Sequence, residues 1–433
     1  MLGFGCRLNA SETEAMAAAL ARQGVLAAPI EHADVVVING CTITHEADKD
    51  AAAAIRRVHR QNPAARIIVT GCYAASSSHQ AADLPGVVAV IGNAEKPDIV
   101  EVVGRALSHR GAPDVTVGQL RRGVPLRVLP PVADARARAL LKIQDGCDYR
   151  CSFCIVPAVR GPSRSIDAPE ILERARALVA AGVAEIVLTG VHLGTWGRDL
   201  GYGQRALGGL VEQLLAVLGP SRLRLSSIDP HEVDPRLVDL LAGEPRGFES
   251  SGRLCRHLHL PVQSCDDGVL SNMRRGHRSA QFVELAHELA AKIPSVAIST
   301  DVIAGFPGED AAAFDRTRDT LVSLPLAYMH VFPYSVRHGT TAATMQGAVP
   351  AAVIRARAAA LRAVSADHAA RFRAAQIGRV VDLVVHLRPD RRGVWWAKTD
   401  HDLALRVGDA SQQAGRRVLA RVAADGEHAE IFA

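Results

Sequence analysis

One stretch of the chain encodes the end of a strand and then three cysteines: Leu141-Lys-Ile-Gln-Asp-Gly-Cys-Asp-Tyr-Arg-Cys-Ser-Phe-Cys-Ile-Val-Pro-Ala-Val-Arg-Gly161. The spacing Cys147-x3-Cys151-x2-Cys154 places three thiols in one tight loop. Cluster irons are normally held by four thiolates, so a loop with three leaves one iron open to a substrate. A zinc site would need a fourth ligand nearby, but the next His or Cys is His192. The spacing therefore favours an iron–sulfur cluster.

Strands and helices alternate around this stretch. The expected strands are Ala139–Ile143, Glu185–Thr189, Arg222–Ser226, His257–Leu260, Val296–Asp301 and Tyr328–Phe332. Helical stretches separate most of them, for instance Ala168–Ala181, Gly208–Leu218 and Ala280–Ala291. Six strand–helix units predict an α/β fold with a partial βα barrel, similar to a TIM barrel but not a full eightfold one.

The two ends of the chain follow different patterns. Near the N-terminus, the runs Asp34–Asn39, Arg66–Thr70 and Val87–Ile91 read as strands, and the alanine-rich stretch Ala47–Arg60 reads as a helix. This alternation predicts a small parallel α/β sheet. From about Gln376 the apolar residues recur with a period of two, which predicts a small all-β barrel.

Length and composition agree with several globular domains. A chain of 433 residues is too long for one ordinary core. We predict a parallel α/β domain over residues 1–110, a link rich in Gly, Pro and Arg over 111–135, the partial barrel over 136–373 and the β barrel over 376–433. An apolar fraction of 48% and a charged fraction of 22% argue against global disorder.

Charge and hydropathy limit the partners. No run approaches the roughly 18 apolar residues of a membrane span, and no signal segment follows Met1. We therefore expect a cytoplasmic protein with no membrane partner. The formal net charge of +5 permits a nucleic-acid partner without requiring one.

The stretch that ends at Gly161 resembles the cluster loop of radical S-adenosylmethionine methylthiotransferases. Three further segments match that family in order and spacing: Thr189-Gly-Val-His-Leu-Gly194, Leu225-Ser-Ser-Ile-Asp-Pro230 and Ser299-Thr-Asp-Val-Ile-Ala-Gly-Phe-Pro-Gly-Glu309. All three lie at or after expected strand ends, where barrel chemistry belongs. The resemblance implies that a 4Fe-4S cluster on Cys147, Cys151 and Cys154 cleaves S-adenosylmethionine into a radical. It also implies cofactor contacts from Thr189, Gly190, Ser227 and Asp301.

A second set of cysteines follows the strands of the N-terminal sheet. Cys6, Cys41 and Cys72 each lie near the C-terminal end of an expected parallel strand, where ligands of open α/β sheets gather. Loop cysteines can also be coincidental. Their surroundings resemble the three cysteine motifs of the methylthiotransferase N-terminal domain: Gly5-Cys6-Arg-Leu-Asn9, Asn39-Gly-Cys41-Thr-Ile-Thr44 and Gly71-Cys72-Tyr73. The resemblance implies a second 4Fe-4S cluster that holds or relays the inserted sulfur. Cys255 and Cys265 are expected to lie outside both sites.

The first cysteine departs from the family in one respect. The family places a full strand before it, whereas this chain offers only Met1-Leu-Gly-Phe-Gly5. This departure puts the edge strand in doubt, but not the ligand.

The resemblance also implies a reaction and a choice of substrates. Members act on tRNA adenosines beside the anticodon or on an aspartate of a ribosomal protein, and they need a sulfur donor, an electron donor and a second S-adenosylmethionine for the methyl group. Three segments resemble the subgroup that modifies N6-threonylcarbamoyladenosine: Asn39–Thr44, Leu188–Gly194 and His330–Thr340. The expected substrate is therefore that base in a tRNA anticodon stem-loop. Arg337 and His338 are candidates to approach a phosphate or the threonyl carboxylate, although a plain solvated turn is an equal alternative.

Other substrates and one other class of protein stay open. Within the family, the alternatives are isopentenyladenosine in tRNA and the ribosomal aspartate. A non-catalytic iron–sulfur RNA-binding module is the alternative outside enzymes. The open three-cysteine loop argues against it, because a structural site would be closed by a fourth ligand.

The C-terminal segment resembles the TRAM domain that grips tRNA in this family. From Gln376 onward, however, the segment contains nine Lys and Arg and eight Asp and Glu. A module that binds phosphates should show a clearer positive balance. Trp395, Trp396 and Lys398 are candidates for base stacking and phosphate contact, although paired tryptophans are more often part of a barrel core. The preceding helix offers a second source of positive charge in Arg355, Arg357, Arg362, Arg371 and Arg373.

Overall fold

The computed structural model describes residues 1–133, 137–243 and 252–432. The chain forms two compact units. The first unit comprises residues 1–132, 144–166 and 335–343, and the second comprises 133–143, 167–334 and 344–433. The expected boundary at residues 135 and 136 and the terminal residue 433 lie outside the described residues. The domain limits given above therefore stay a prediction.

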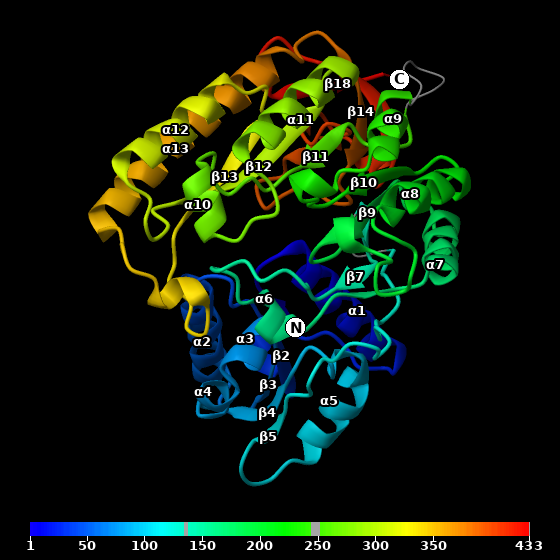
Figure 1. The fold of residues 1–433 in the computed structure, drawn as a ribbon. Coiled ribbons are helices and arrows are strands. Elements are labelled where there is room, and N and C mark those ends of the chain that lie inside the picture. Colours follow the sequence, from blue (N-terminus) through cyan, green and yellow to red (C-terminus); the bar gives the residue numbers. More distant parts are fainter. Residues whose placement is uncertain (134–136, 244–251, 433) are drawn as a thin grey trace. The chain divides into compact units, whose positions relative to one another are not determined.

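The first unit is built on a parallel sheet in the order β1-β2-β3-β4-β5 (Figure 1). Its strands are β1 (Leu2–Gly3), β2 (Val35–Gly40), β3 (Arg66–Gly71), β4 (Val87–Ile91) and β5 (Asp114–Thr116). Its helices are α1 (Arg7–Arg22), α2 (His45–Gln61), α3 (Cys72–Ser76), α4 (Ser78–Ala82) and α5 (Ile99–Ser108), with the 3-10 turns η1 (Ile30–His32) and η2 (Lys96–Asp98). The unit also contains β7 (Gln144–Asp145), α6 (Val156–Arg160) and β8 (Arg164–Ser165). The parallel sheet expected from the sequence is confirmed.

Helices cover both faces of this sheet. Successive strand residues point to opposite faces. Ile38 packs with Ile55 of α2, whereas Val37 packs with Met16 of α1 and Val103 of α5. The continuous apolar runs of β2 and β3 are therefore buried on both sides, as in other α/β sheets.

Of the two edge strands of the first unit, the one before Cys6 was expected with doubt and the other was not expected. β1 has only two residues, and Leu2 pairs with Ile38 of β2. The short segment before the first cysteine thus does form the edge strand. β5 lies inside the stretch expected to be a link, and its three residues are all exposed. An exposed edge strand carries no apolar pattern, so the sequence gives no signal for it.

The second unit contains the six parallel strands expected for a partial barrel, which is confirmed. They are β6 (Arg138–Lys142), β9 (Glu185–Thr189), β10 (Arg222–Leu225), β11 (His257–His259), β12 (Ala297–Ala304) and β13 (Tyr328–Pro333). They form two three-stranded sheets, β10-β9-β6 and β11-β12-β13, and a parallel bridge between Ser227 and His259 joins β10 to β11.

Helices alternate with these strands and cover the barrel (Figure 1). They are α7 (Ala168–Ala180), α8 (Ala206–Val217), α9 (Pro235–Gly243), α10 (Asp267–Asn272), α11 (Ser279–Lys292), α12 (Ala311–Ser323) and α13 (Ala351–Ala374). The 3-10 turns of this unit are η3 (Leu193–Thr195) and η4 (Pro230–Glu232), whereas η5 (Thr341–Thr344) begins in the segment 335–343 of the first unit. Within the described ranges, none of the helices combines the length and apolarity that crossing a membrane requires.

The C-terminal segment is a closed barrel with the strand order β14-β15-β16-β18-β17. Its elements are β14 (Val380–Val385), β15 (Trp395–Thr399), β16 (Ala404–Val407), η6 (Ser411–Gln413), β17 (Arg417–Val422) and β18 (His428–Ile431). Val381, Leu383 and Val385 alternate into its core. The all-β barrel expected from the period of two is confirmed.

A buried ionic network joins the two barrels of the second unit. Glu185, Arg222 and Arg224 are fully buried. Glu185 accepts hydrogen bonds from Arg222 Nε and Arg224 Nε, each at 2.7 Å. The same arginines donate to backbone carbonyls of the C-terminal barrel, Arg222 to Asp382 O (2.9 Å) and Arg224 to Thr399 O (2.7 Å). Burial alone would raise the pKa of Glu185, but both guanidinium groups hold the pKa far below its usual value.

Glu185→Gln should lower the free energy of unfolding by roughly 3–5 kcal/mol, because it removes the carboxylate that pairs with both buried arginines and leaves them only the longer ion pairs with Asp382 (3.2 Å) and Asp402 (3.5 Å). Chemical denaturation followed by circular dichroism measures the change. Glu173→Gln on an exposed site of α7 is the matched control and should stay within about 0.5 kcal/mol. Equal stability of the two variants would mean that the network does not hold the barrels together.

Candidate iron–sulfur sites

The three N-terminal cysteines meet at the carboxyl edge of the first sheet. Cys6 follows β1 as the N-cap of α1, Cys41 follows β2 directly, and Cys72 follows β3 as the first residue of α3. The strands end at one level because Gly3 pairs with Asn39. Three positions spread over the chain are thus brought to one edge, as the sequence predicted.

Close approach at this edge depends on a glycine. Gly5 has a φ of 98°, and a Cβ there would lie 2.5 Å from Cys41 Cβ and 2.8 Å from Cys41 Sγ. Burial, and after it the neighbouring thiols of Cys72 and Cys6, raise the pKa of Cys41 to about 11. The absence of a side chain at Gly5 therefore lets the segment before Cys6 approach Cys41 closely.

The central cysteines form the other group of three in the same unit. Cys147, Cys151 and Cys154 are all partly buried. Burial, and after it the neighbouring thiols of Cys154 and Cys151, raise the pKa of Cys147 to about 12. Gly146 before them has a φ of 71°, and a Cβ there would collide with the carbonyl oxygen of Pro162. A side chain at this position would therefore force the loop open.

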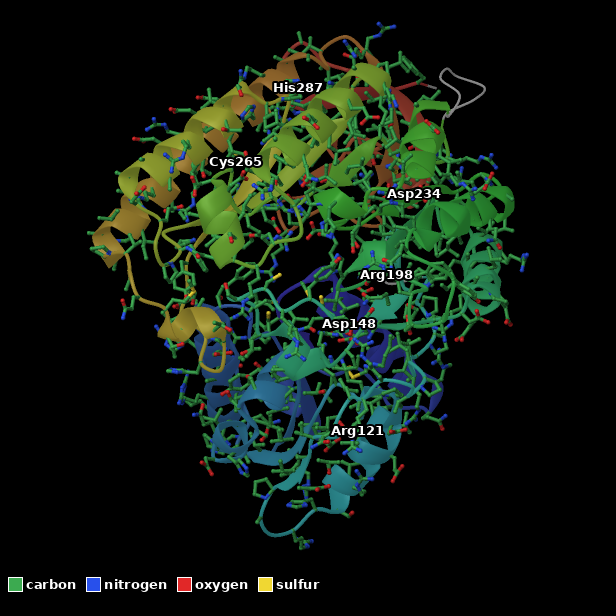
Figure 2. All side chains as sticks on the ribbon, in the orientation of Figure 1. Arg121, Asp148, Arg198, Asp234, Cys265 and His287 are labelled. Carbon is green, nitrogen blue, oxygen red and sulfur yellow. The ribbon has the colours of Figure 1, made fainter. Side chains whose placement is uncertain are left out.

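Hydrogen bonds tie together the two ends of this loop. Cys147 N donates to Gly161 O (3.0 Å), and Ser163 N donates to Asp148 Oδ1 (3.2 Å). Asp148, which is labelled in Figure 2, also pairs with Arg122 (2.9 Å). The loop is thus fixed in shape by its own backbone and flanks.

The donor chemistry of both groups fits an iron–sulfur cluster. Each group offers three thiols, which is one fewer than a closed cluster needs. The remaining two cysteines are buried in the second unit. Cys255 lies 3.8 Å from Glu185 Oε2, and Cys265 precedes α10 (Figure 2).

Two side chains that the sequence did not single out hydrogen bond to Cys72. Arg160 Nε donates to Cys72 Sγ at 3.1 Å, and Asn93 Nδ2 lies 3.9 Å from the same sulfur. Asn93 Nδ2 also donates to Val159 O at 2.8 Å. Arg160 stands inside the cysteine stretch, but nothing in the local pattern shows that it turns toward the other group. Asn93 has no sequence signal, because only the fold brings its loop here.

The segment after β13 contacts both cysteine loops within the first unit. Arg337 Nη1 pairs with Asp48 Oδ2 (2.7 Å), and its Nη2 donates to Thr42 Oγ1 (2.5 Å) beside Cys41. Ala342 N donates to Ser152 O (2.7 Å) beside Cys151. Arg337 is 9% exposed. Because its guanidinium is engaged inside the protein, the expected contact of Arg337 with a substrate phosphate or carboxylate is not supported.

The expected cofactor-contacting residues lie in the second unit. Thr189 is buried at the end of β9, Gly190 follows it, and Ser227 bridges to His259 after β10. Asp301 lies within β12, and its Oδ1 is 3.0 Å from His259 Nε2. Their contacts with S-adenosylmethionine stay a prediction.

Two family models match the chain. Residues 1–92 match the uncharacterized protein family UPF0004, and residues 141–321 match the radical SAM superfamily. The first match covers Cys6, Cys41 and Cys72, and the second covers Cys147, Cys151 and Cys154.

Relatives of similar length extend these matches. The chain is 36% identical to the threonylcarbamoyladenosine tRNA methylthiotransferase MtaB of Bacillus subtilis, over 88% of this chain and 83% of the relative. It is 33% identical to the tRNA-2-methylthio-N(6)-dimethylallyladenosine synthase of a Parafrankia species, over 88% and 76%. Among solved structures, the radical S-adenosylmethionine methyltransferase TsrM of Kitasatospora setae is similar in fold, with a TM-score of 0.50 at 16% identity over 72% of this chain and 66% of that one.

Proposed function

Because this chain belongs to the radical S-adenosylmethionine tRNA methylthiotransferases, we propose that it inserts sulfur and a methyl group at C2 of N6-threonylcarbamoyladenosine beside the tRNA anticodon. The observation that supports this function most is the presence of two groups of three thiols in one compact unit. The substrate follows from the relatives named MtaB, which match at 33–36% identity. The relatives named for dimethylallyladenosine, at 33% or less, make that base the second candidate.

Cys147, Cys151 and Cys154 would hold the cluster that works with S-adenosylmethionine. When bound, this cluster and cofactor supply the radical chemistry that an unactivated aromatic carbon requires. The chain itself supplies three thiolates, a loop closed by its flanks, and one coordination position left to the cofactor.

Cys6, Cys41 and Cys72 would hold a second 4Fe-4S cluster at the sheet edge. All three lie at one edge of the first sheet, and two donors are directed at Cys72 Sγ. Three thiolates would again leave one iron open, here for the sulfur that is inserted. An electron donor and a sulfur donor complete the reaction, which we place in the cytoplasm with its tRNA.

The C-terminal barrel is more basic at its surface than in its composition. Three of its eight acidic residues, Asp382, Asp400 and Asp402, are buried. Lys398 pairs with Asp402 at 3.1 Å, so the expected phosphate contact of Lys398 is not supported. The loop between β14 and β15 instead exposes Arg388, Arg391 and Arg392. We propose that this loop provides the grip on tRNA phosphates.

Replacing all three arginines of this loop with glutamine should weaken tRNA binding and make its salt dependence shallower. Loss of three phosphate contacts should reduce the log–log salt slope by roughly two units. Fluorescence anisotropy at several salt concentrations measures both quantities. Arg355, Arg362 and Arg371 are exposed on α13, and their triple glutamine variant is the matched control. A loss of tRNA affinity confined to this control would place the phosphate contacts on α13 instead.

A direct assay separates the two candidate substrates. The reconstituted enzyme is incubated under anaerobic, reducing conditions with two anticodon stem-loops, one carrying N6-threonylcarbamoyladenosine and one carrying dimethylallyladenosine. Mass spectrometry of the nucleosides should show a methylthio group on the first only. Modification of the second only would replace the proposed substrate with the alternative.

A further inference from the structure

Arg160 is a fully buried guanidinium whose five N–H groups all point at acceptors. Nε donates to Cys72 Sγ at 3.1 Å. Nη1 donates to Glu12 Oε1 (2.9 Å) and Asp145 Oδ1 (3.0 Å). Nη2 donates to Asn9 Oδ1 (2.6 Å) and Glu12 Oε2 (3.1 Å). An arginine has five donors in a fixed fork, so this site uses its full capacity, and one donor is committed to a sulfur.

The charges around Arg160 balance without Cys72. Glu12 and Asp145 carry two negative charges, and Arg160 and the buried Lys96, which also binds Glu12, carry two positive charges. Burial opposes the charge of Arg160, but Cys72, Glu12 and Asp145 together raise the pKa of its guanidinium well above the usual value. The Nε–H thus brings a permanent cationic donor to the sulfur, and such donors make the stronger hydrogen bonds.

Arg160 comes from the other cysteine loop. It is the last residue of α6, which begins two residues after Cys154. Ile155 and Val159 pack against Cys72. The helix that follows Cys154 is therefore fastened, by packing and by a charged hydrogen bond, to Cys72 of the N-terminal group.

We propose that Arg160 is a positioning residue that donates a charged hydrogen bond to the Cys72 ligand and raises the reduction potential of the second cluster. This proposal rests on the second cluster of the proposed function. Hydrogen bonds to ligand sulfurs and local net charge set the potentials of iron–sulfur clusters. A nearby cation favours the reduced, more negative form. Because the donor is carried on the loop of the first cluster, Arg160 also fixes that loop relative to the second cluster.

The test measures a midpoint potential in full-length protein that holds only the second cluster. The background replaces Cys147, Cys151 and Cys154 with alanine. In this background, Arg160→Lys keeps the positive charge but loses the fork of guanidinium donors. The double variant R160Q/D145N removes one positive and one negative charge. Both should keep their iron and shift the potential downward by at least a tenfold change in the ratio of oxidised to reduced cluster, about 59 mV for a one-electron couple. Redox titration followed by electron paramagnetic resonance gives the value.

Arg127→Lys is the matched control. Arg127 binds both oxygens of Asp98 in the same unit, so the same fork is removed from an exposed carboxylate with no sulfur in contact. It should leave the potential unchanged. If Arg160→Lys unfolds, as judged by circular dichroism, the charge-balanced pair decides. An unchanged potential in the folded variants overturns the role of Arg160 alone. Absence of any cluster from the background with Arg160 intact overturns the second cluster itself.

Discussion

Replacing Cys151 with alanine is expected to abolish the reductive cleavage of S-adenosylmethionine. Cys151 is the middle thiol of the loop, and the other two cannot hold a cluster whose third ligand is lost. The measurement is 5′-deoxyadenosine release from anaerobically reconstituted, reduced protein. The product should fall to the background of protein without iron, and methylthio insertion should fall with it.

Cys265→Ala is the matched control for this loss, because it makes the same change at a buried cysteine of the second unit. It should keep the cleavage activity of the parent protein. Continued release of 5′-deoxyadenosine by the Cys151 variant would remove Cys147, Cys151 and Cys154 from their proposed role.

Replacing Cys72 with alanine is expected to separate the two halves of the reaction. The Cys72 thiol lies outside the central loop, at the edge of the first sheet. We expect the variant to keep releasing 5′-deoxyadenosine, while the methylthio product falls to background because the inserted sulfur has no site. Mass spectrometry of tRNA nucleosides and of the released cofactor product gives both yields in one reaction.

The Cys72 variant is informative because the loss of methylthio insertion and the loss of S-adenosylmethionine cleavage are distinct outcomes. Iron content should fall by about half relative to the parent protein if each group holds one cluster of equal size. A Cys72 variant that still inserted sulfur would contradict the second cluster. Loss of cleavage as well would mean that the two groups depend on one another for assembly.

The elements with a strong apolar pattern could be predicted from the sequence. β2, β3, β9 and β12 are buried runs, and buried parallel strands read as continuous apolar segments. β1 stayed in doubt, because it has only two residues, and β5 could not be predicted, because it is exposed. Spacing alone identified the central cysteines as a group, since they are neighbours in the chain.

The surroundings of the two sites depend on the fold and could not be predicted in the same way. The contact of Arg160 with Glu12 spans 148 positions, and that of Arg337 with Thr42 spans 295. No local pattern encodes such pairs. The expected role of Arg337 was not supported for the same reason, since its partner Asp48 is far away in the sequence. Lys398 instead meets Asp402, which lies only four residues further along the chain.

The most direct test of the proposed function is the nucleoside content of tRNA from a strain that lacks this protein. We predict that 2-methylthio-N6-threonylcarbamoyladenosine disappears and that N6-threonylcarbamoyladenosine accumulates in its place. The intact gene should restore the modified base, and the Cys72→Ala form should not. Persistence of the 2-methylthio form of threonylcarbamoyladenosine, with loss of that of dimethylallyladenosine or of the modified ribosomal aspartate, would contradict the proposal.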